Sequence, residues 1–324
     1  MSTISSSVHA SKRAIALAAA GLLLCGMWSS TRGATVVAGT VTDEVTATPI
    51  AGASLRIANG GALLTSTTAG PDGTFRLAFN LANTPAPQNL KLTVHAESYV
   101  DAAKDVIVTS GHTDQNSYRI VLTPKAVADC RLLRNHLVVV GYFRPPVGAP
   151  AELQLAARIK DTLDYDVLAR LQKVEIAPPA QPVFVACEKI VPQTLADYPG
   201  LTQALKADAF VSGYVAPAAA GSPKVKVQMT IGNRFRLQDP PVRASTPDVD
   251  LNDPETVRLQ AAAQTAIFAA LIAGYQQSGQ ATECVQAANA AEQAIGSLPA
   301  ALAEARKACE RATPNSGLVR GGGP

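Results

Sequence analysis

Three of the four histidines lie beyond residue 34, and histidine is the side chain best suited to proton transfer or metal ligation near neutral pH. They are His95, His112 and His136. His95 falls in the alternation of a predicted strand, His112 in a predicted turn, and His136 at the start of another strand. None of them is spaced with the cysteines as zinc ligands would be. Their placement therefore predicts surface or capping roles.

One group of acidic residues suggests a cation site. Asp161, Asp164 and Asp166 lie in a predicted helix. Three acids over six helical positions spread across more than one face, so they predict a solvated helix surface rather than a site.

A second acidic run, from Asp248 to Asp253, begins like a calcium-binding loop. Its sixth position would be Asp253 instead of glycine, and its twelfth would be Leu259 instead of glutamate. Helix capping explains Asp253 better. We therefore expect no metal and no cofactor.

The sequence contains no nucleophile elbow, metalloprotease, P-loop or dinucleotide-binding motif. This predicts a protein that is not an enzyme. An unrecognised hydrolase using Asp161 and His136 is the catalytic alternative. The candidates for binding are Arg144, Pro145 and Pro146, in a loop after the first buried strand, because ligands of α/β sheets often bind at such edges. A rigid connector is the alternative interpretation of that loop.

Residues 1–34 predict an export signal rather than part of the fold. Lys12 and Arg13 precede the apolar run Ala14–Trp28, which is shorter than the ~20 residues of a membrane-spanning helix. An uncleaved anchor and a lipidated Cys25 are the alternatives, and only these would bring the protein to a membrane. Cleavage removes three basic residues and no acid, so the net charge falls from +3 to zero. A neutral chain gives no electrostatic basis for binding nucleic acid.

Residues 35–124 predict an all-β domain, with short strands and turn signals every ~8–12 residues. Within Thr67–Phe79, Pro71 presets φ for a turn and Gly73 accepts a positive φ. Alternation then places three apolar side chains on one face of the next strand: Phe75, Leu77 and Phe79. We expect Asp72 in the turn to be structural rather than a ligand.

The segments VAGTVTDEVTATPIAGASLRI, TTAGPDGTFRL and LTVHAESYV together resemble the carboxypeptidase regulatory-like domain. The residues that fit its pattern are Gly39, Val41, Asp43, Pro49, Ile50, Gly52, Ala53, Gly73 and Phe75. Ser98 replaces the usual glycine before Tyr99, so this corner is expected to be built differently. The resemblance implies a seven-stranded, transthyretin-like β-sandwich, a fold that hosts many functions.

Residues 131–250 predict a small α/β domain with the order βαβαββ. The expected strands are 136–143, 183–186, 209–217 and 225–232, and the expected helices are 151–171 and 193–206. The segments VVVGYF, RIKDTL and LKADAFVSGYV are similar to the N-terminal domain of TolB and to the curli-export lipoprotein CsgG. Ala207, Asp208 and Gly213 fit the most recognisable strand of that family.

Residues 253–312 predict helices that end in a hairpin, and 313–324 a disordered tail. Asp253 is expected to cap the first helix. Gly296 is expected to close helix 280–295, and Ser297 to cap helix 298–312.

Four cysteines follow the predicted signal, an even number that suggests two disulfides in an exported chain. Cys284 and Cys309 are equidistant from the hairpin turn, so their thiols should face each other. A disulfide between Cys130 and Cys187 then follows by elimination. The absence of any C-x-x-C argues against redox or metal chemistry.

These features predict a multidomain fold: a seven-stranded sandwich, a small α/β domain and a helical hairpin. The predicted function is a non-catalytic scaffold that binds a protein partner in an envelope complex, in the periplasm or associated with a membrane. A carbohydrate- or peptidoglycan-binding module is the main alternative. It is weakened because sugars usually stack on aromatic rings, and the single tryptophan, Trp28, lies in the predicted signal.

Overall fold

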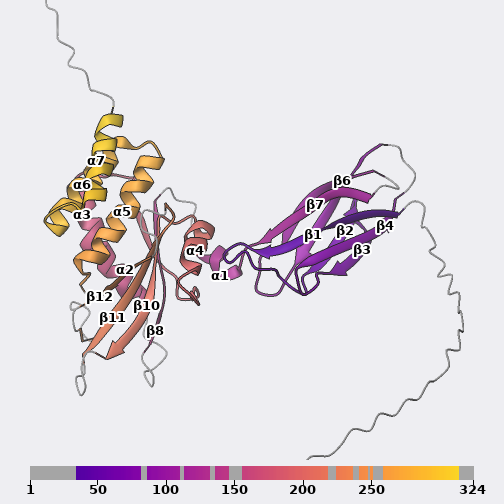
Figure 1. Ribbon diagram of the computed structural model, residues 1–324, viewed down its shortest axis with the longest axis horizontal. Helices are drawn as coiled ribbons and strands as arrows, with labels where there is room; N and C mark the ends of the chain where they lie inside the picture. The colour runs from indigo at the N-terminus through magenta and orange to yellow at the C-terminus, as the bar shows by residue number, and fades with distance from the viewer. Residues whose placement is uncertain are drawn as a thin grey trace, which may run out of the picture.

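The structure is a computed structural model that describes residues 34–81, 86–109, 113–131, 136–145, 155–217, 224–235, 241–246, 249–250 and 258–313. Figure 1 shows a part made of strands alone, joined to a second part in which helices flank a sheet. The fold is thus mixed and β-rich, with helices towards the C-terminus, as predicted. Nearly all of the predicted signal and tail lies outside the described residues. Within them, no helix is long and apolar enough to cross a bilayer.

The N-terminal part is a β-sandwich of two sheets. Its strands are β1 (Ala34–Asp43), β2 (Ser54–Asn59), β3 (Ala62–Thr68), β4 (Thr74–Asn80), β5 (Gln88–His95), β6 (Ala102–Val108) and β7 (Thr113–Leu122). One sheet has the order β4-β1-β7 and the other β3-β2-β5-β6. β1 is antiparallel to β4 and parallel to β7.

The core between these sheets follows the predicted alternation. Phe75, Leu77 and Phe79 are buried along β4, while the residues between them are exposed. They share one hydrophobic cluster with Leu55 and Ile57 of the other sheet. Period-two patterning therefore fixes which face of β4 points inward.

The turn before β4 is stabilised by contacts among its own residues. Gly73 has φ +71°, and its missing Cβ would lie 2.5 Å from the Val41 carbonyl oxygen. The Thr74 backbone N–H and hydroxyl both donate to the Asp72 carboxylate, at 3.0 and 2.7 Å. These bonds hold the pKa of Asp72 below its usual value.

Ser98 keeps the backbone conformation that a glycine would adopt at this corner, with φ 67°. The next residue, Tyr99, donates its hydroxyl to Asp43 at 2.8 Å. Burial and this carboxylate raise the pKa of Tyr99 to about 12. The loss of glycine therefore does not change the course of the chain here.

The second part is built on one five-stranded sheet. Its strands are β8 (Leu137–Arg144), β9 (Val183–Ala186), β10 (Ala209–Pro217), β11 (Val225–Asn233) and β12 (Val242–Ser245), in the order β12-β11-β10-β8-β9. β9, β8 and β10 are parallel, whereas β11 and β12 are antiparallel to their neighbours. The first five residues of β8 are all buried, as expected for a strand covered on both faces.

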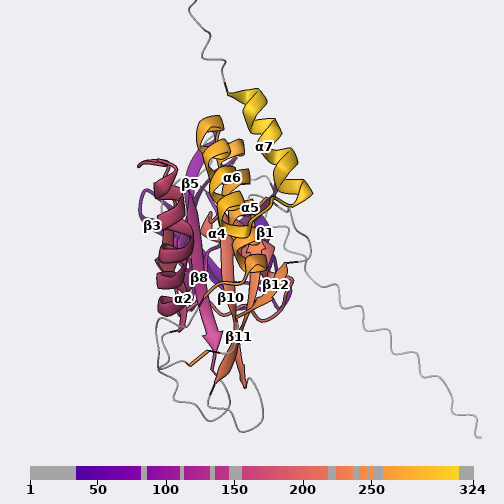
Figure 2. The same cartoon turned by 90° about the vertical axis from the view of Figure 1, so that its left-hand side faces the viewer.

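Helices cover the two faces of this sheet unequally. One face carries α2 (Leu155–Leu163), the π-helical turn η1 (Asp164–Leu168), α3 (Ala169–Lys173) and α5 (Ala261–Gln277), which share a hydrophobic cluster with it. Figure 2 shows α2 and α5 beside β8 and β10. On the other face, the helices of the described residues are α1 (Lys125–Cys130) and α4 (Asp197–Leu205).

Several boundaries differ from the predictions. The helix expected at 151–171 is interrupted by η1, and the one expected at 193–206 begins at Asp197. The four-residue strand β12 and the six-residue helix α1 were not predicted.

Two further helices, α6 (Ala281–Ile295) and α7 (Ala300–Ala312), form the C-terminal hairpin. Gly296 closes α6 with φ +82°, as predicted. The expected cap at Ser297 is wrong: α7 begins after Pro299 and has no side-chain cap, because the chain continues through Leu298 and Pro299 before the first helical turn. Asp253 lies outside the described residues.

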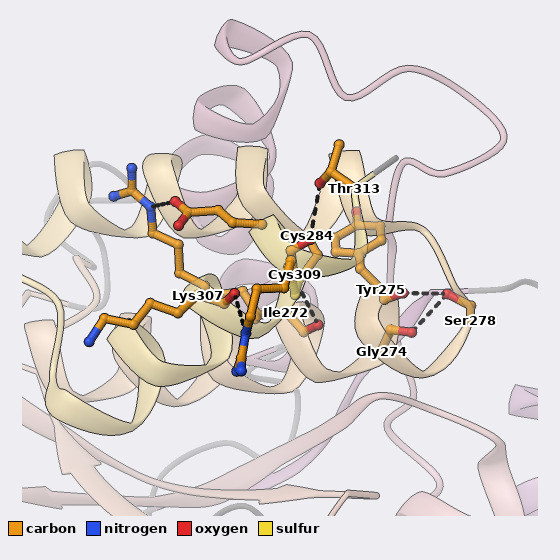
Figure 3. The surroundings of a disulfide bond; sticks show 11 residues. Ile272, Gly274, Tyr275, Ser278, Cys284, Lys307, Cys309 and Thr313 are labelled. Atoms are coloured by element: carbon orange, nitrogen blue, oxygen red, sulfur yellow. Dashed lines mark hydrogen bonds and ion pairs between the residues drawn. A yellow bond between two sulfur atoms is a disulfide. The ribbon is translucent and has the colours of Figure 1, made fainter. Parts of the chain in front are cut away.

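Both cysteine pairs that the sequence predicted lie at disulfide distance. Cys284 and Cys309 join α6 to α7, with Cα atoms 6.0 Å apart, and Figure 3 shows this bond beside Tyr275 at the end of α5. Cys130 and Cys187 join the end of α1 to the residue after β9, with Cα atoms 6.1 Å apart.

The sandwich contacts the second part through the loop after β1. The Arg131 guanidinium donates to both oxygens of Glu44 at 2.8 Å. Val45 packs on the cluster formed by α1, α4 and the sheet. A Cβ on Gly200 of α4 would lie 1.9 Å from the Val45 carbonyl oxygen, so only glycine permits this approach.

Candidate functional site

Arg144, the first of the predicted binding residues, is the last residue of β8 and lines a hollow of about 210 Å³. Pro145 follows it, and Pro146 lies outside the described residues. The hollow is also lined by Tyr142, Tyr214 and the loop 191–195. Arg144 therefore belongs to a surface depression rather than to an isolated connector.

A bulge in β8 brings these side chains together. Val140 pairs with Val211, whereas Phe143 pairs with Gly213, so β8 contains one residue more than β10 at this point. The extra residue places Tyr142 on the α4 side of the sheet, where it lines the hollow with Arg144.

Cross-strand pairing extends the surface over neighbouring strands. Arg144 pairs with Tyr214, and Tyr214 pairs with Gln228, to which its hydroxyl donates a hydrogen bond. One row closer to α4, Ser212 pairs with Thr230, and Thr230 pairs with Arg243. Paired residues share a face, so these rows form one polar surface, here called the α4-side face.

The α4-side face is open because α4 covers only one end of the strands, as Figure 1 shows. Tyr198 of α4 packs on Gly232, whose Cβ would lie 2.8 Å from that of the tyrosine. The Tyr198 hydroxyl is 2.5 Å from Ser212 Oγ at the floor of the hollow. Burial raises the pKa of this tyrosine, so it acts as a neutral hydrogen-bonding group.

The α4-side face carries positive charge. Among the described residues, neither Arg144 nor Arg243 has an acceptor for its guanidinium. The nearby Asp197 is already occupied, because it accepts the backbone N–H groups of Gln193 and Thr194 at 2.7 and 2.9 Å. The surface thus offers the guanidinium groups of Arg144 and Arg243 to a ligand from solvent.

His136 does not have the predicted surface or capping role, because its side chain is only 1% exposed. Its Nδ1 lies 3.0 Å from Asp208 Oδ2, and its Nε2 lies 2.6 Å from Gln280 Oε1. Arg234 donates to the other oxygen of Asp208 at 3.0 Å. Tyr275 of α5 stacks beside the imidazole, with 4.2 Å between ring centroids.

This buried network joins the sheet to the C-terminal helices. A Cβ on Gly274 of α5 would lie 2.6 Å from Asp208 Oδ2, so the helix reaches the carboxylate only through a glycine. Burial raises the pKa of Asp208, while His136 and Arg234 oppose this shift. Each of the three ionisable groups has a partner in the network, which is the arrangement expected of a structural cluster.

The structure does not bring Asp161 and His136 together. Asp161 is an exposed residue of α2 that pairs with Lys160 at 3.5 Å. Asp164 pairs with the same lysine, and Asp166 accepts the backbone N–H of Leu259. Within the described part of the chain, no group of three His, Cys, Asp or Glu residues is placed to hold a metal ion.

His95 is exposed, as predicted, and its Nδ1 lies 2.6 Å from Asp101. His112, Asp248 and Asp253 lie outside the described residues. Sequence reasoning missed Asp208 as the partner of His136, because the two are 72 positions apart and meet only through the parallel pairing of β8 and β10.

Comparisons with known proteins identify one region. The family model of the carboxypeptidase regulatory-like domain matches residues 36–123. No curated protein matches the chain. The expected similarity of residues 131–250 to TolB and CsgG is not shown by these comparisons and stays a prediction.

Two solved structures each resemble 28% of the chain. The 5-hydroxyisourate hydrolase of Klebsiella pneumoniae is 17% identical over 28% of this chain and 90% of its own, with a TM-score of 0.21. The 3-chlorocatechol 1,2-dioxygenase of Rhodococcus opacus 1CP is 13% identical over 28% of this chain, which spans 59% of that enzyme, with a TM-score of 0.22. Likenesses at these TM-scores say nothing about activity. Residues 36–123, a β-sandwich with the expected turn and core, are therefore a carboxypeptidase regulatory-like domain.

Proposed function

We propose that this chain is an exported, non-catalytic protein of the cell envelope that acts as a binding or assembly scaffold. The observation that carries the proposal is the α4-side face, where Arg144 and Arg243 flank tyrosine and amide side chains. Among the described residues, neither arginine has an acceptor for its guanidinium. Interfaces are enriched in Tyr and Arg, and these residues often supply most of the binding energy. We infer a protein partner with an acidic, hydrogen-bonding surface.

The proposed organisation is a seven-stranded sandwich (35–124), an α/β domain (131–250) and helices ending in a hairpin (253–312). Two disulfides within a chain that begins with an export-like segment support a non-reducing compartment, such as the periplasm. The contacts of Glu44 with Arg131, and of Val45 with Gly200, support a sandwich held firmly on the α/β domain. Such a scaffold would present the α4-side face in a constant orientation.

The hydrolase alternative has less support. It requires His136 to act with Asp161, but His136 is buried with Asp208, and Asp161 is exposed on α2. A general base must reach the proton that it removes from the substrate. We therefore do not assign a reaction to these residues.

Site-specific photo-crosslinking in envelope fractions tests the proposal. A photoreactive phenylalanine analogue placed at Tyr214 (49% exposed) should form one discrete crosslink. The matched control is Tyr165 (78% exposed), on η1 at the opposite face. Arg144→Glu should reduce the Tyr214 crosslink at least about tenfold, because it reverses a charge at the interface.

The scaffold hypothesis fails if Tyr214 gives no crosslink above the Tyr165 background. Equal yields for Arg144→Glu and for Arg76→Glu, an exposed arginine on β4 of the sandwich, would also contradict it.

A further inference from the structure

A second hollow, of about 380 Å³, lies on the outer face of the sheet β3-β2-β5-β6 of the sandwich. Its polar lining consists of Ser54, Arg56, Lys91, Thr93, His95 and Asp101. These residues lie far from the α4-side face in sequence and on a different sheet, so the hollow is independent of the proposed scaffold function.

Side-chain size explains the hollow. Arg56 pairs with Thr93 across β2 and β5, and Thr93 pairs with Ala103 of β6. One row therefore passes from a long side chain to a short one and then to a methyl group. Lys91 and His95 stand two residues to either side of Thr93 on the same face of β5. Long polar side chains thus surround a floor of small residues.

The acidic side chain of the hollow has a partner, whereas its two basic side chains do not have one among the described residues. The Asp101 carboxylate is engaged by His95 at 2.6 Å, which leaves the second imidazole nitrogen available for hydrogen bonding. Among the described residues, the side chains of Arg56 and Lys91 have no acceptor within ion-pair distance. Asp105 is the cross-strand neighbour of Lys91 but makes no ion pair with it. The lining thus contains two basic side chains, Arg56 and Lys91, and one carboxylate, Asp101, which His95 already engages.

We propose that this hollow binds a small monoanionic carboxylate that carries hydroxyl groups, such as a sugar acid. Two basic side chains beside one engaged carboxylate match a ligand with one carboxylate better than a phosphate dianion. The planar fork of Arg56 suits a carboxylate, with Lys91 as a second donor. The Ser54 hydroxyl can exchange hydrogen bonds with ligand hydroxyls, and the Thr93 hydroxyl, which donates to the Arg56 carbonyl, can accept one.

The position of the hollow favours a ligand recognised by side chains. β2 pairs with both β3 and β5, and β5 pairs with both β2 and β6. Their backbone groups are therefore used within the sheet, and an extended peptide cannot add to these strands. The ligand must be recognised by the side chains on the face of the sheet.

Isothermal titration of the full chain with glucuronate, glucose and inorganic phosphate tests the proposal. Glucuronate should bind saturably, and glucose and phosphate should bind more weakly. Arg56→Gln should weaken glucuronate binding at least about tenfold, because it removes a charge-assisted hydrogen bond. The matched control is Arg76→Gln, which removes the same charge from the outer face of the other sheet and should leave the affinity unchanged.

A second variant separates charge from shape. Ala103→Phe fills the floor of the hollow without changing its charge and should also abolish binding. Folding of each variant is checked by its thermal unfolding midpoint. The proposal is overturned if glucuronate does not bind, if glucose or phosphate binds as tightly, or if Arg76→Gln weakens binding as much as Arg56→Gln.

Discussion

The sandwich and the α/β part with its helices are stabilised in different ways. No cysteine occurs in residues 35–124, and large side chains such as Leu55, Phe75 and Leu92 fill the core of the sandwich. In the second part, α6 buries mainly alanines, and both disulfides are found there. Alanine buries little apolar area, so a helix rich in it gains less from burial. Cross-links supply what the small side chains do not.

Two carboxylates, one from each region, also have different surroundings. Asp72 of the sandwich lies in an exposed turn and is stabilised by donors from Thr74. Asp208 of the α/β part is fully buried, and its partners are His136 and Arg234. The charge of Asp72 thus stays at the surface, whereas that of Asp208 is enclosed.

The largest expected effects come from truncating one core at a time. Phe75→Ala should destabilise the sandwich, and Phe143→Ala the α/β part, each by about 3–5 kcal/mol. Both phenylalanines are at least nine-tenths buried. Hydrogen exchange followed by mass spectrometry should show lost protection only in the region that carries the substitution. Loss of protection across the whole chain in either variant would mean that the regions unfold as one unit.

Reduction of the disulfides should change the stability of the two regions to nearly as different an extent. Opening the 25-residue loop between Cys284 and Cys309 is expected to cost about 3–4 kcal/mol in the chain-entropy account. Added reductant should therefore raise exchange in α6 and α7 and leave β1–β7 unchanged. The double variant Cys284→Ser/Cys309→Ser should reproduce the effect without reductant. An equal increase of exchange in β1–β7 would contradict the idea that only the second part depends on disulfides.

The sequence was sufficient to predict what depends on local pattern. The alternation of Phe75, Leu77 and Phe79, the positive φ of Gly73 and the C-cap at Gly296 all follow from neighbouring residues. The cysteine pair of the hairpin was also accessible, because the position of one turn determines which residues face each other.

The residues that the sequence did not place are those positioned by distant strands. His136 looked like a surface residue, because nothing near it in sequence shows that Asp208 and Gln280 enclose it. Arg144 was found as a candidate, but the α4-side face was not. That face depends on the bulge in β8 and on the unpredicted strand β12, which adds Arg243.

A smaller effect is expected at the contact between the regions. Gly200→Ala places a Cβ against the Val45 carbonyl and should cost about 1–3 kcal/mol through overpacking. Exchange should rise around Val45 and α1 while both cores stay protected. Gln203→Ala, at an exposed position of the same helix, controls for the higher helix propensity of alanine. Unchanged exchange at the junction would show that the contact between Gly200 and Val45 tolerates a Cβ.

The smallest expected effect concerns pH. The contributions of Asp72 and Asp208 to stability should change with pH in opposite directions. The pKa of Asp72 is lowered in the folded state, so its contribution to stability exists above the ordinary aspartate pKa of 3.8 and is lost as pH falls through the folded pKa. The pKa of Asp208 is raised, so its contribution exists below 3.8 and is lost as pH rises through the folded pKa.

Urea unfolding of Asp72→Asn and Asp208→Asn, measured between acidic and neutral pH, checks these signs. The stability of the wild type relative to Asp72→Asn should increase with pH, and that relative to Asp208→Asn should decrease. Slopes of the same sign would show that burial does not govern the behaviour of Asp208.

If the proposed export signal is removed, the position of β1 limits where the cut can fall. The strand begins at Ala34, the last residue of the predicted signal, and it lies between β4 and β7. A peptidase that cut several residues further along would remove the start of the central strand and leave its neighbours without a backbone partner. For the same reason, an affinity tag inserted beyond Ala34 would interrupt the sheet, whereas one placed before it would leave the sheet intact.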